Sequence, residues 1–200
     1  MTRRHALTAL LVTTSLLLAA CGGDGEQKQA SAIDGDPSTT IPAALTNLDP
    51  PKPRDPNKPL PVTNAVKNVS TDLKVKPVLG KPSGAAPKEL QGLDVVTGKG
   101  PIAKAGDTVQ MQYVGVTFKD GKEFDTSFKG AGGKPGEPLE VTLGQGGVIK
   151  GWDEGIPGMK AGGRRILVIP PDLAYGSTGS PPNIGPDETL VFAVDLVKIG

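Results

Sequence analysis

The sequence predicts an α+β domain in which an antiparallel sheet of five or six strands packs against one short helix. Short strand-like runs, separated by glycine and proline, fill the second half of the chain. One glycine-flanked stretch in that half has helical spacing instead. All seven aromatic residues lie between Tyr113 and Phe192, so the hydrophobic core is expected there.

The strands are predicted from apolar runs bounded by turn residues. They cover residues 91–97, 108–118, 122–126, 139–143, 164–169 and 189–199. The second and third runs are joined through Asp120-Gly121, a strong signal for a tight turn. In the last run, Leu190, Phe192, Val194 and Leu196 alternate with other residues, so they share one face, which should be buried.

The only tryptophan, Trp152, marks the predicted helix. Val148, Ile149, Trp152 and Ile156 recur at roughly helical spacing, and glycines flank the run. From the spacing, Trp152 is either a core residue that holds the helix under the sheet or the floor of an apolar pocket. The nearby loop of residues 170–188 is long enough to indicate a functional lid or a binding loop.

Composition excludes several kinds of chemistry. The net charge is +1 and no basic stripe is present, so binding to nucleic acid is not expected. His5 and Cys21 are single examples of their types, which excludes a histidine-based triad, a disulfide and a His/Cys metal site. No metal or cofactor is therefore expected, and chemistry must use carboxylates, hydroxyls, backbone groups and an apolar surface.

Residues 1–20 have the pattern of a signal peptide. Arg3 and Arg4 precede an uncharged, mostly apolar run that is shorter than the ~20 residues of a membrane span. The run ends in Leu18-Ala19-Ala20-Cys21, which resembles the lipobox of bacterial lipoproteins. The resemblance implies a lipid on Cys21 and attachment to the extracytoplasmic face of the cell membrane. The alternative is an ordinary signal peptide with a chance cysteine.

Residues 21–71 are predicted to form a disordered tether rich in proline and glycine. Pro50, Pro53, Pro56 and Pro59 recur every third residue, which is typical of an extended polyproline spacer or of a ligand for a partner's groove. The alternating residues 72–79 predict an edge strand. The folded domain is expected to span residues 72–200, with its core in residues 88–200.

Several motifs in the second half of the chain resemble the FKBP-type peptidyl-prolyl cis–trans isomerases, the family that binds rapamycin. They occur in family order at Gly106-Asp107-Thr108-Val109, Tyr113-Val114-Gly115, Asp120-Gly121-Lys122-Glu123-Phe124-Asp125-Thr126-Ser127, Val148-Ile149-Lys150-Gly151-Trp152-Asp153-Glu154-Gly155, Pro171-Asp172-Leu173-Ala174-Tyr175-Gly176 and Thr189-Leu190-Val191-Phe192. The resemblance covers residues 88–200 and implies an antiparallel sheet wrapped around a short helix.

The resemblance also implies a set of site residues. Trp152 would form the floor under a proline ring, Ile149 would offer its backbone N–H to a ligand carbonyl, and Tyr175 would donate its hydroxyl to the carbonyl of the isomerising bond. The catalytic set implied is Asp125, Tyr175, Ile149, Trp152 and Phe192. The substrate contacts implied are Tyr113, Phe124, Asp125, Leu139, Val148, Ile149, Trp152, Tyr175, Ile184 and Phe192.

Other roles remain open for some of these residues. Asp125 would lie at the rim near the Tyr113 hydroxyl, or it fixes a turn through its carboxylate. Tyr175 could instead cap its own loop. Three departures from the family concern the rim: Leu139 replaces an aromatic residue, Ser180 a histidine and Asn183 an apolar residue. They leave isomerisation expected, but leave peptide preference and macrolide affinity open.

Isomerisation fits a chain with a single histidine and a single cysteine. Rotation about an amide meets a barrier of ~18–20 kcal/mol but breaks no covalent bond, so it requires neither a nucleophile nor a metal. The expected function is a prolyl isomerase that assists the folding of exported or envelope proteins. Its expected partners are proline-containing peptides, unfolded exported proteins and macrolides of the rapamycin type, bound by a monomer. The alternatives are a lipid-tethered chaperone or adaptor that binds proline-containing segments with little catalysis, and a spacer head without binding.

Overall fold

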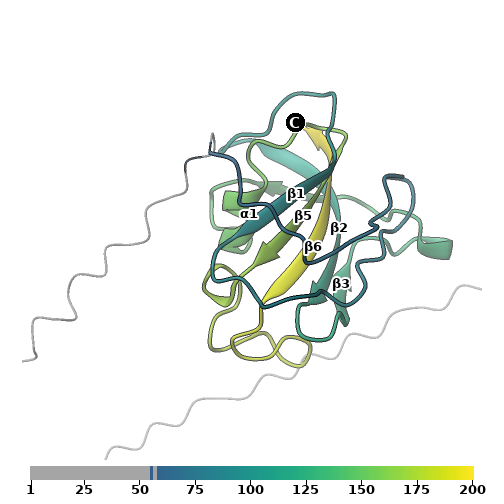
Figure 1. The fold of residues 1–200 in the computed structure, drawn as a ribbon. Helices are drawn as coiled ribbons and strands as arrows, with labels where there is room; N and C mark the ends of the chain where they lie inside the picture. The colour runs from purple at the N-terminus through teal and green to yellow at the C-terminus, as the bar shows by residue number, and fades with distance from the viewer. Residues whose placement is uncertain (1–54, 56–57) are drawn as a thin grey trace, which may run out of the picture. The chain divides into compact units, whose positions relative to one another are not determined.

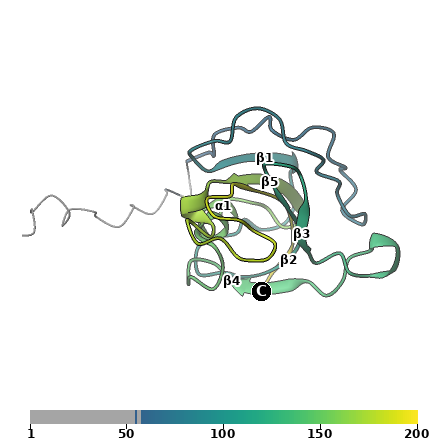
Figure 2. The ribbon, with the colours of Figure 1, turned by 90° about the horizontal axis from the view of Figure 1, so that it is seen from below.

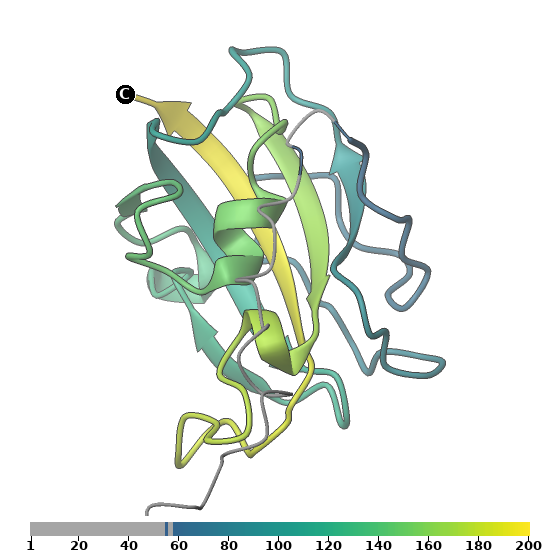
Figure 3. The same cartoon turned by 90° about the vertical axis from the view of Figure 1, so that its left-hand side faces the viewer.

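A computed structural model describes Asp55 and residues 58–200 of the chain (Figure 1). Six antiparallel strands form one sheet in this part of the chain: β1 (Gln91–Val96), β2 (Thr108–Thr117), β3 (Glu123–Thr126), β4 (Leu139–Thr142), β5 (Gly163–Ile169) and β6 (Leu190–Ile199). The strand order is β1-β5-β6-β2-β3, and β4 pairs with a further part of β2. The helix α1 (Lys150–Gly155) lies in front of the sheet in Figure 3.

The predicted α+β fold is therefore confirmed. Each predicted strand agrees with an observed strand to within one residue at either end. The helix is shorter than the apolar pattern that predicted it. Val148 and Ile149 precede the helix, because the backbone of Ile149 is extended. Two short 3₁₀ turns, Ala131–Gly133 and Pro171–Leu173, lie in the longer connections.

The sheet is buried on both faces. On one face, Leu190, Phe192, Val194 and Leu196 pack with Trp152 and other buried residues in a first core cluster. Their neighbours Val191 and Ala193 point the other way, into a second cluster that also holds Val114, Val116 and Ile166. Because successive side chains of a strand alternate between faces, β6 contributes to both clusters and lies at the centre of the core.

Two glycines allow α1 to approach β5 closely. A Cβ atom at Gly151 would lie 2.8 Å from Ile169 Cδ1, and one at Gly155 would lie 2.8 Å from Leu167 Cδ2. Both glycines are buried. The helix backbone therefore rests on the apolar side chains of the strand, which places Trp152 against the sheet.

Replacing Gly151 with alanine is expected to destabilise the domain although alanine favours helices. The gain in helix propensity is about 1 kcal/mol, whereas overpacking a core costs about 1–3 kcal/mol. Urea unfolding should therefore give a lower free energy of unfolding for Gly151→Ala. The matched control is Gly185→Ala, whose added Cβ would meet only Glu188 Oε2, at 3.9 Å. A Gly151→Ala variant at least as stable as the parent would contradict the close approach.

A segment without named strands, residues 58–83, covers the second cluster, and we call it the strap. Val66 and Leu79 of the strap are buried in that cluster, and Val62 pairs with Gly92 of β1 in a parallel bridge. Figure 2 shows the strap as the dark blue ribbon that passes over β1 and β5. The strap closes the outer face of the sheet, which would otherwise expose a continuous apolar surface.

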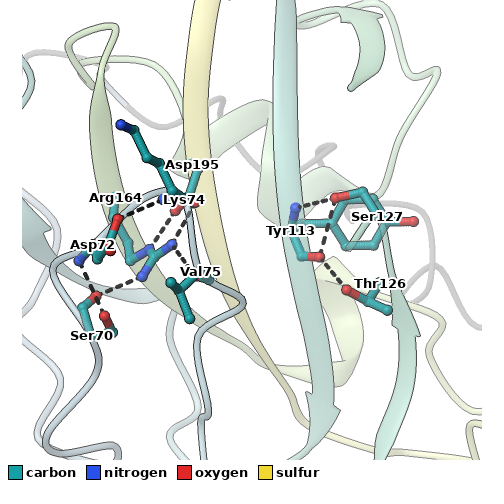
Figure 4. Close-up of polar contacts among 9 residues, drawn as sticks. All are labelled: Ser70, Asp72, Lys74, Val75, Tyr113, Thr126, Ser127, Arg164 and Asp195. Carbon is teal, nitrogen blue, oxygen red and sulfur yellow. Dashed lines mark hydrogen bonds and ion pairs between the residues drawn. The ribbon is translucent and has the colours of Figure 1, made fainter. Parts of the chain in front are cut away.

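The buried Arg164 of β5 anchors the strap (Figure 4). Its Nε and Nη2 donate to the two carboxylate oxygens of Asp195 on β6, at 2.5 and 2.6 Å. Its Nη1 donates to the carbonyl oxygen of Ser70 at 2.6 Å, and Nη2 also donates to that of Val75 at 3.3 Å. One planar guanidinium thus joins two strands to the strap, a geometry that a lysine could not reproduce.

Two expectations about the segment before residue 88 need correction. The tether was predicted to extend to residue 71, but residues 58–71 pack on the domain, with Thr63 and Val66 buried. The predicted edge strand over residues 72–79 is absent, because the backbone turns at Asp72 and directs the Val75 carbonyl to Arg164. The alternating pattern does not follow burial, since Val75 and Val78 are exposed.

The predicted signal peptide, the lipidation site at Cys21 and most of the predicted tether lie outside the described residues. Within the part that the structure describes, no helix has both the length and the apolar character to cross a bilayer.

Candidate active site

A pocket of about 200 Å³ opens on the helix side of the sheet. Its lining combines aromatic, aliphatic and a few polar groups from β2, β3, β4, α1, β6 and two loops. The lining residues are Tyr113, Phe124, Asp125, Leu139, Gly147, Val148, Ile149, Trp152, Tyr175 and Phe192. The structure thus brings together every predicted substrate contact except Ile184, and it adds Gly147.

Trp152 is the centre of the aromatic packing. Its ring centroid lies 5.2 Å from that of Tyr113 and 5.2 Å from that of Phe192, with interplanar angles of 71° and 80°. Phe124 meets Phe192 edge-on at 5.5 Å. Such edge-to-face pairs fix ring orientations and each contribute about 0.5–1.5 kcal/mol beyond burial. Trp152 is 4% exposed, so it is a core residue and a pocket residue at the same time.

Gly115 of β2 makes room for the two phenylalanine rings. A Cβ atom at this position would lie 2.6 Å from Phe124 Cζ and 2.8 Å from Phe192 Cε1. Any side chain at Gly115 would therefore displace the rings from the wall that they form. Gly115 belongs to one of the recognised motifs, but no residue type or spacing in that motif indicates that it contacts the pocket residues.

Tyr113 and Asp125 form the polar edge of the pocket. The Tyr113 hydroxyl donates to Asp125 Oδ2 at 2.6 Å, while Asp125 Oδ1 accepts from the Thr126 N–H at 2.8 Å. Figure 4 shows that the Tyr113 backbone is held as well, because its N–H donates to Ser127 Oγ at 2.7 Å and its carbonyl accepts from Thr126 Oγ1 at 2.9 Å. Asp125 therefore contacts both the pocket rim and its own turn.

Tyr113 is expected to stay protonated at unusually high pH. Burial, then the hydrogen bond and negative charge of Asp125, raise the pKa of Tyr113 above its ordinary value of about 10. Because the pKa of Tyr113 is higher in the folded state than in the unfolded state, Tyr113 contributes to the free energy of unfolding. This contribution is fully present below pH ~10 and is lost as the pH rises further. Tyrosinate absorbance in a Tyr175→Phe chain would report Tyr113 alone, since the sequence has two tyrosines. An ordinary midpoint in the folded protein would contradict this prediction.

Ile149 and Tyr175 bring hydrogen-bond donors to the pocket. The Ile149 carbonyl accepts from the Trp152 N–H at 2.9 Å, whereas no hydrogen bond from the Ile149 N–H is found among the described residues. Tyr175 is 40% exposed, and its carbonyl accepts from the Gly179 N–H at 3.1 Å. No described residue receives a hydrogen bond from its hydroxyl, so capping of the loop involves its backbone.

Ile184 does not line the pocket. It is 5% exposed and packs in the first core cluster. The backbones of Ser180 and Ile184 exchange hydrogen bonds of 2.9 and 3.0 Å, which close the tip of the long loop. Gly147 was missed by the sequence analysis, and its only signal was its position directly before Val148.

Comparisons with known proteins agree with this fold and pocket. Residues 100–197 match the family model described as FKBP-type peptidyl-prolyl cis-trans isomerase. A protein named "FK506-binding protein" from Streptomyces anulatus is 49% identical over 125 residues, which cover 62% of this chain and 97% of that protein. The chain belongs to the family of FKBP-type peptidyl-prolyl cis–trans isomerases and is an enzyme of that class, as its motifs predicted.

Two further comparisons support the assignment. A "Probable FK506-binding protein" from Corynebacterium glutamicum is 45% identical over 123 residues, covering 62% of this chain and 98% of that protein. Among solved structures, the crystal structure of AtFKBP13 has a TM-score of 0.50 and 37% sequence identity, covering 57% of this chain and 96% of that chain.

Proposed function

We propose that the aromatic pocket is the isomerase active site and that it binds the proline ring of X–Pro segments on Trp152. The observation that carries this proposal is one solvent-open pocket that combines an aromatic floor with the Ile149 N–H and the Tyr175 side chain. Phe192 and Phe124 enclose the ring from the side. The Ile149 N–H and the Tyr175 hydroxyl donate to substrate carbonyls, and Asp125 keeps Tyr113 in place at the rim.

Such a site accelerates rotation without covalent chemistry. At the top of the barrier the amide is twisted and loses its resonance and much of its dipole. An apolar pocket disfavours the planar, polar ground state relative to the twisted state, and so binds the transition state more tightly. Each ~1.4 kcal/mol of this preference gives a tenfold acceleration.

The proposed substrates are proline-containing segments of unfolded exported proteins. The enzyme is proposed to act as a monomer, anchored through a lipid on Cys21 at the extracytoplasmic face of the cell membrane. The signal-like residues 1–20 and the single cysteine that follows them support this location. Macrolides are proposed as competing ligands, because two relatives are named for binding FK506. Leu139, Ser180 and Asn183 are expected to set the affinity for them.

The activity is tested with the chain from residue 22 to residue 200, purified without lipid. The assay measures isomerisation of short peptides that differ in the residue before proline, with and without rapamycin. Catalysis that rapamycin blocks supports the proposed site. A folded protein that binds proline peptides without catalysis would favour the adaptor alternative, and one that neither binds nor catalyses would overturn the proposal.

The location is tested separately with Cys21→Ser. Expression of the full sequence in a bacterium should give a membrane-bound protein that incorporates labelled fatty acid. The Cys21→Ser chain should lose the label and leave the membrane fraction. Unchanged membrane association without label would contradict lipid anchoring.

A further inference from the structure

The loop of residues 144–148 lies in the connection between β4 and α1, and its end forms one wall of the pocket. Its last residues, Gly147 and Val148, line the pocket together with the adjoining Ile149. Gly144 and Gly146 have φ angles of 76° and 69°, and residues 144–147 are exposed. A glycine-rich, exposed loop has a large conformational freedom, so an ordered wall requires something that holds it.

The Asp153 carboxylate supplies that support. The Gly144 N–H donates to Asp153 Oδ1 at 2.8 Å, and the Gly146 N–H donates to Asp153 Oδ2 at 3.2 Å. Among the described residues, these are the only hydrogen bonds found for residues 144–148. Both oxygens of one side chain are therefore engaged in fixing one loop.

The position of Asp153 links this support to the pocket floor. Asp153 directly follows Trp152 in α1, and its own N–H donates to the Ile149 carbonyl at 3.4 Å. Asp153 itself is absent from the pocket lining. The helix α1 therefore has two roles. It carries Trp152, and through the side chain of Asp153 it also holds the loop of residues 144–148, which leads to Ile149.

We propose that Asp153 is a positioning residue of the isomerase, which sets the wall formed by Gly147, Val148 and Ile149 relative to the Trp152 floor. The proposal rests on the active-site assignment above. Without the carboxylate, the loop gains freedom, and the Ile149 N–H and Val148 side chain no longer hold one position. Substrate affinity should then fall more than the rate of the bound complex, because ordering the loop must accompany binding.

The test compares Asp153→Ala, Asp153→Asn and Asp153→Glu in the chain of residues 22–200. The alanine variant is expected to raise KM for an X–Pro peptide about tenfold, because it removes two hydrogen bonds to a charged group. Asparagine keeps one acceptor oxygen and should have an intermediate effect, and glutamate should recover part of the affinity. The maximal rate should change less than KM in all three variants.

Two readouts separate positioning from a general loss of structure. Amide exchange at Gly144 and Gly146 should accelerate in Asp153→Ala, and the emission of the only tryptophan should shift while urea unfolding stays cooperative. The matched control is Asp107→Asn, which alters a carboxylate that accepts one backbone N–H, from Lys104 at 2.8 Å, outside the pocket. Its KM should match that of the parent.

The outcomes also distinguish this inference from the proposed function. A parent protein without catalysis would overturn the active-site proposal. A catalytic parent whose Asp153→Ala variant keeps the same KM, amide exchange and emission would overturn the positioning role alone. A rise in KM of similar size in Asp107→Asn would likewise overturn it, because the Asp107 carboxylate accepts from the Lys104 N–H and has no hydrogen bond to residues 144–148.

Discussion

Replacing Trp152 with leucine is expected to lower kcat/KM for X–Pro peptides by about tenfold or more, which corresponds to a loss of at least ~1.4 kcal/mol of transition-state binding. Leucine is apolar, but it lacks the flat surface that we propose holds the proline ring, and it lacks the ring edges that meet Tyr113 and Phe192. The same replacement should lower the free energy of unfolding by about 2–4 kcal/mol, because Trp152 is buried.

A matched control separates these two effects. Phe128→Leu also shortens a buried aromatic side chain, but Phe128 belongs to the second core cluster and does not line the pocket. It should cost a comparable amount of stability and leave kcat/KM close to that of the parent. Peptide assays and urea unfolding on both variants provide the measurement. If Phe128→Leu loses as much activity as Trp152→Leu, the loss comes from reduced stability and not from a role of Trp152 in the pocket.

Replacing Arg164 with methionine is expected to lower the free energy of unfolding by about 3–5 kcal/mol. The change leaves the Asp195 carboxylate buried without its partner, and it frees the strap carbonyls of Ser70 and Val75. Urea unfolding at neutral pH measures the loss. Loss of strap packing should in addition speed amide exchange at Val66 and Leu79.

The double variant Arg164→Met/Asp195→Leu provides the control. Because it removes the buried charge together with its partner, it should recover most of the stability lost by Arg164→Met. Burial raises the pKa of Asp195, although Arg164 opposes this effect. A carboxyl whose pKa is raised on folding favours the folded state at low pH, so the cost of Arg164→Met should shrink as pH falls. If Arg164→Met lowers the free energy of unfolding by the same amount at every pH, the loss does not come from an unpaired charge on Asp195.

The sheet could be predicted because its signals are local. Glycine and proline mark the ends of each run, and the alternation of Leu190, Phe192, Val194 and Leu196 identifies one buried face of β6. The strap could not be predicted in this way. Its anchor Arg164 is 94 residues from Ser70 and 89 residues from Val75, and the contacts use backbone carbonyls that no sequence pattern reveals.

The pocket was predictable to the extent that its side chains belong to the recognised motifs. Trp152, Tyr113 and Phe124 were named from these motifs, and all three line the pocket. Two other features depend on the three-dimensional course of the backbone. Gly115 leaves the space that the Phe124 and Phe192 rings occupy, and Ile184 packs in the first core cluster in a loop whose tip closes on Ser180. Neither effect can be derived from residue type and spacing.

Because the strap covers one face of the sheet, a stable fragment of this domain must include the strap and β1. The family match begins at residue 100, whereas the packed part of the chain already includes residues 58–99. A gene fragment cut at the match would lack β1, leave the edge of β5 unpaired and expose the apolar side chains of Val114, Val116 and Ile166. Such a fragment would be prone to associate through that edge and face. The unit that can be moved intact between proteins is therefore longer than the segment of residues 100–197 that matches the family model.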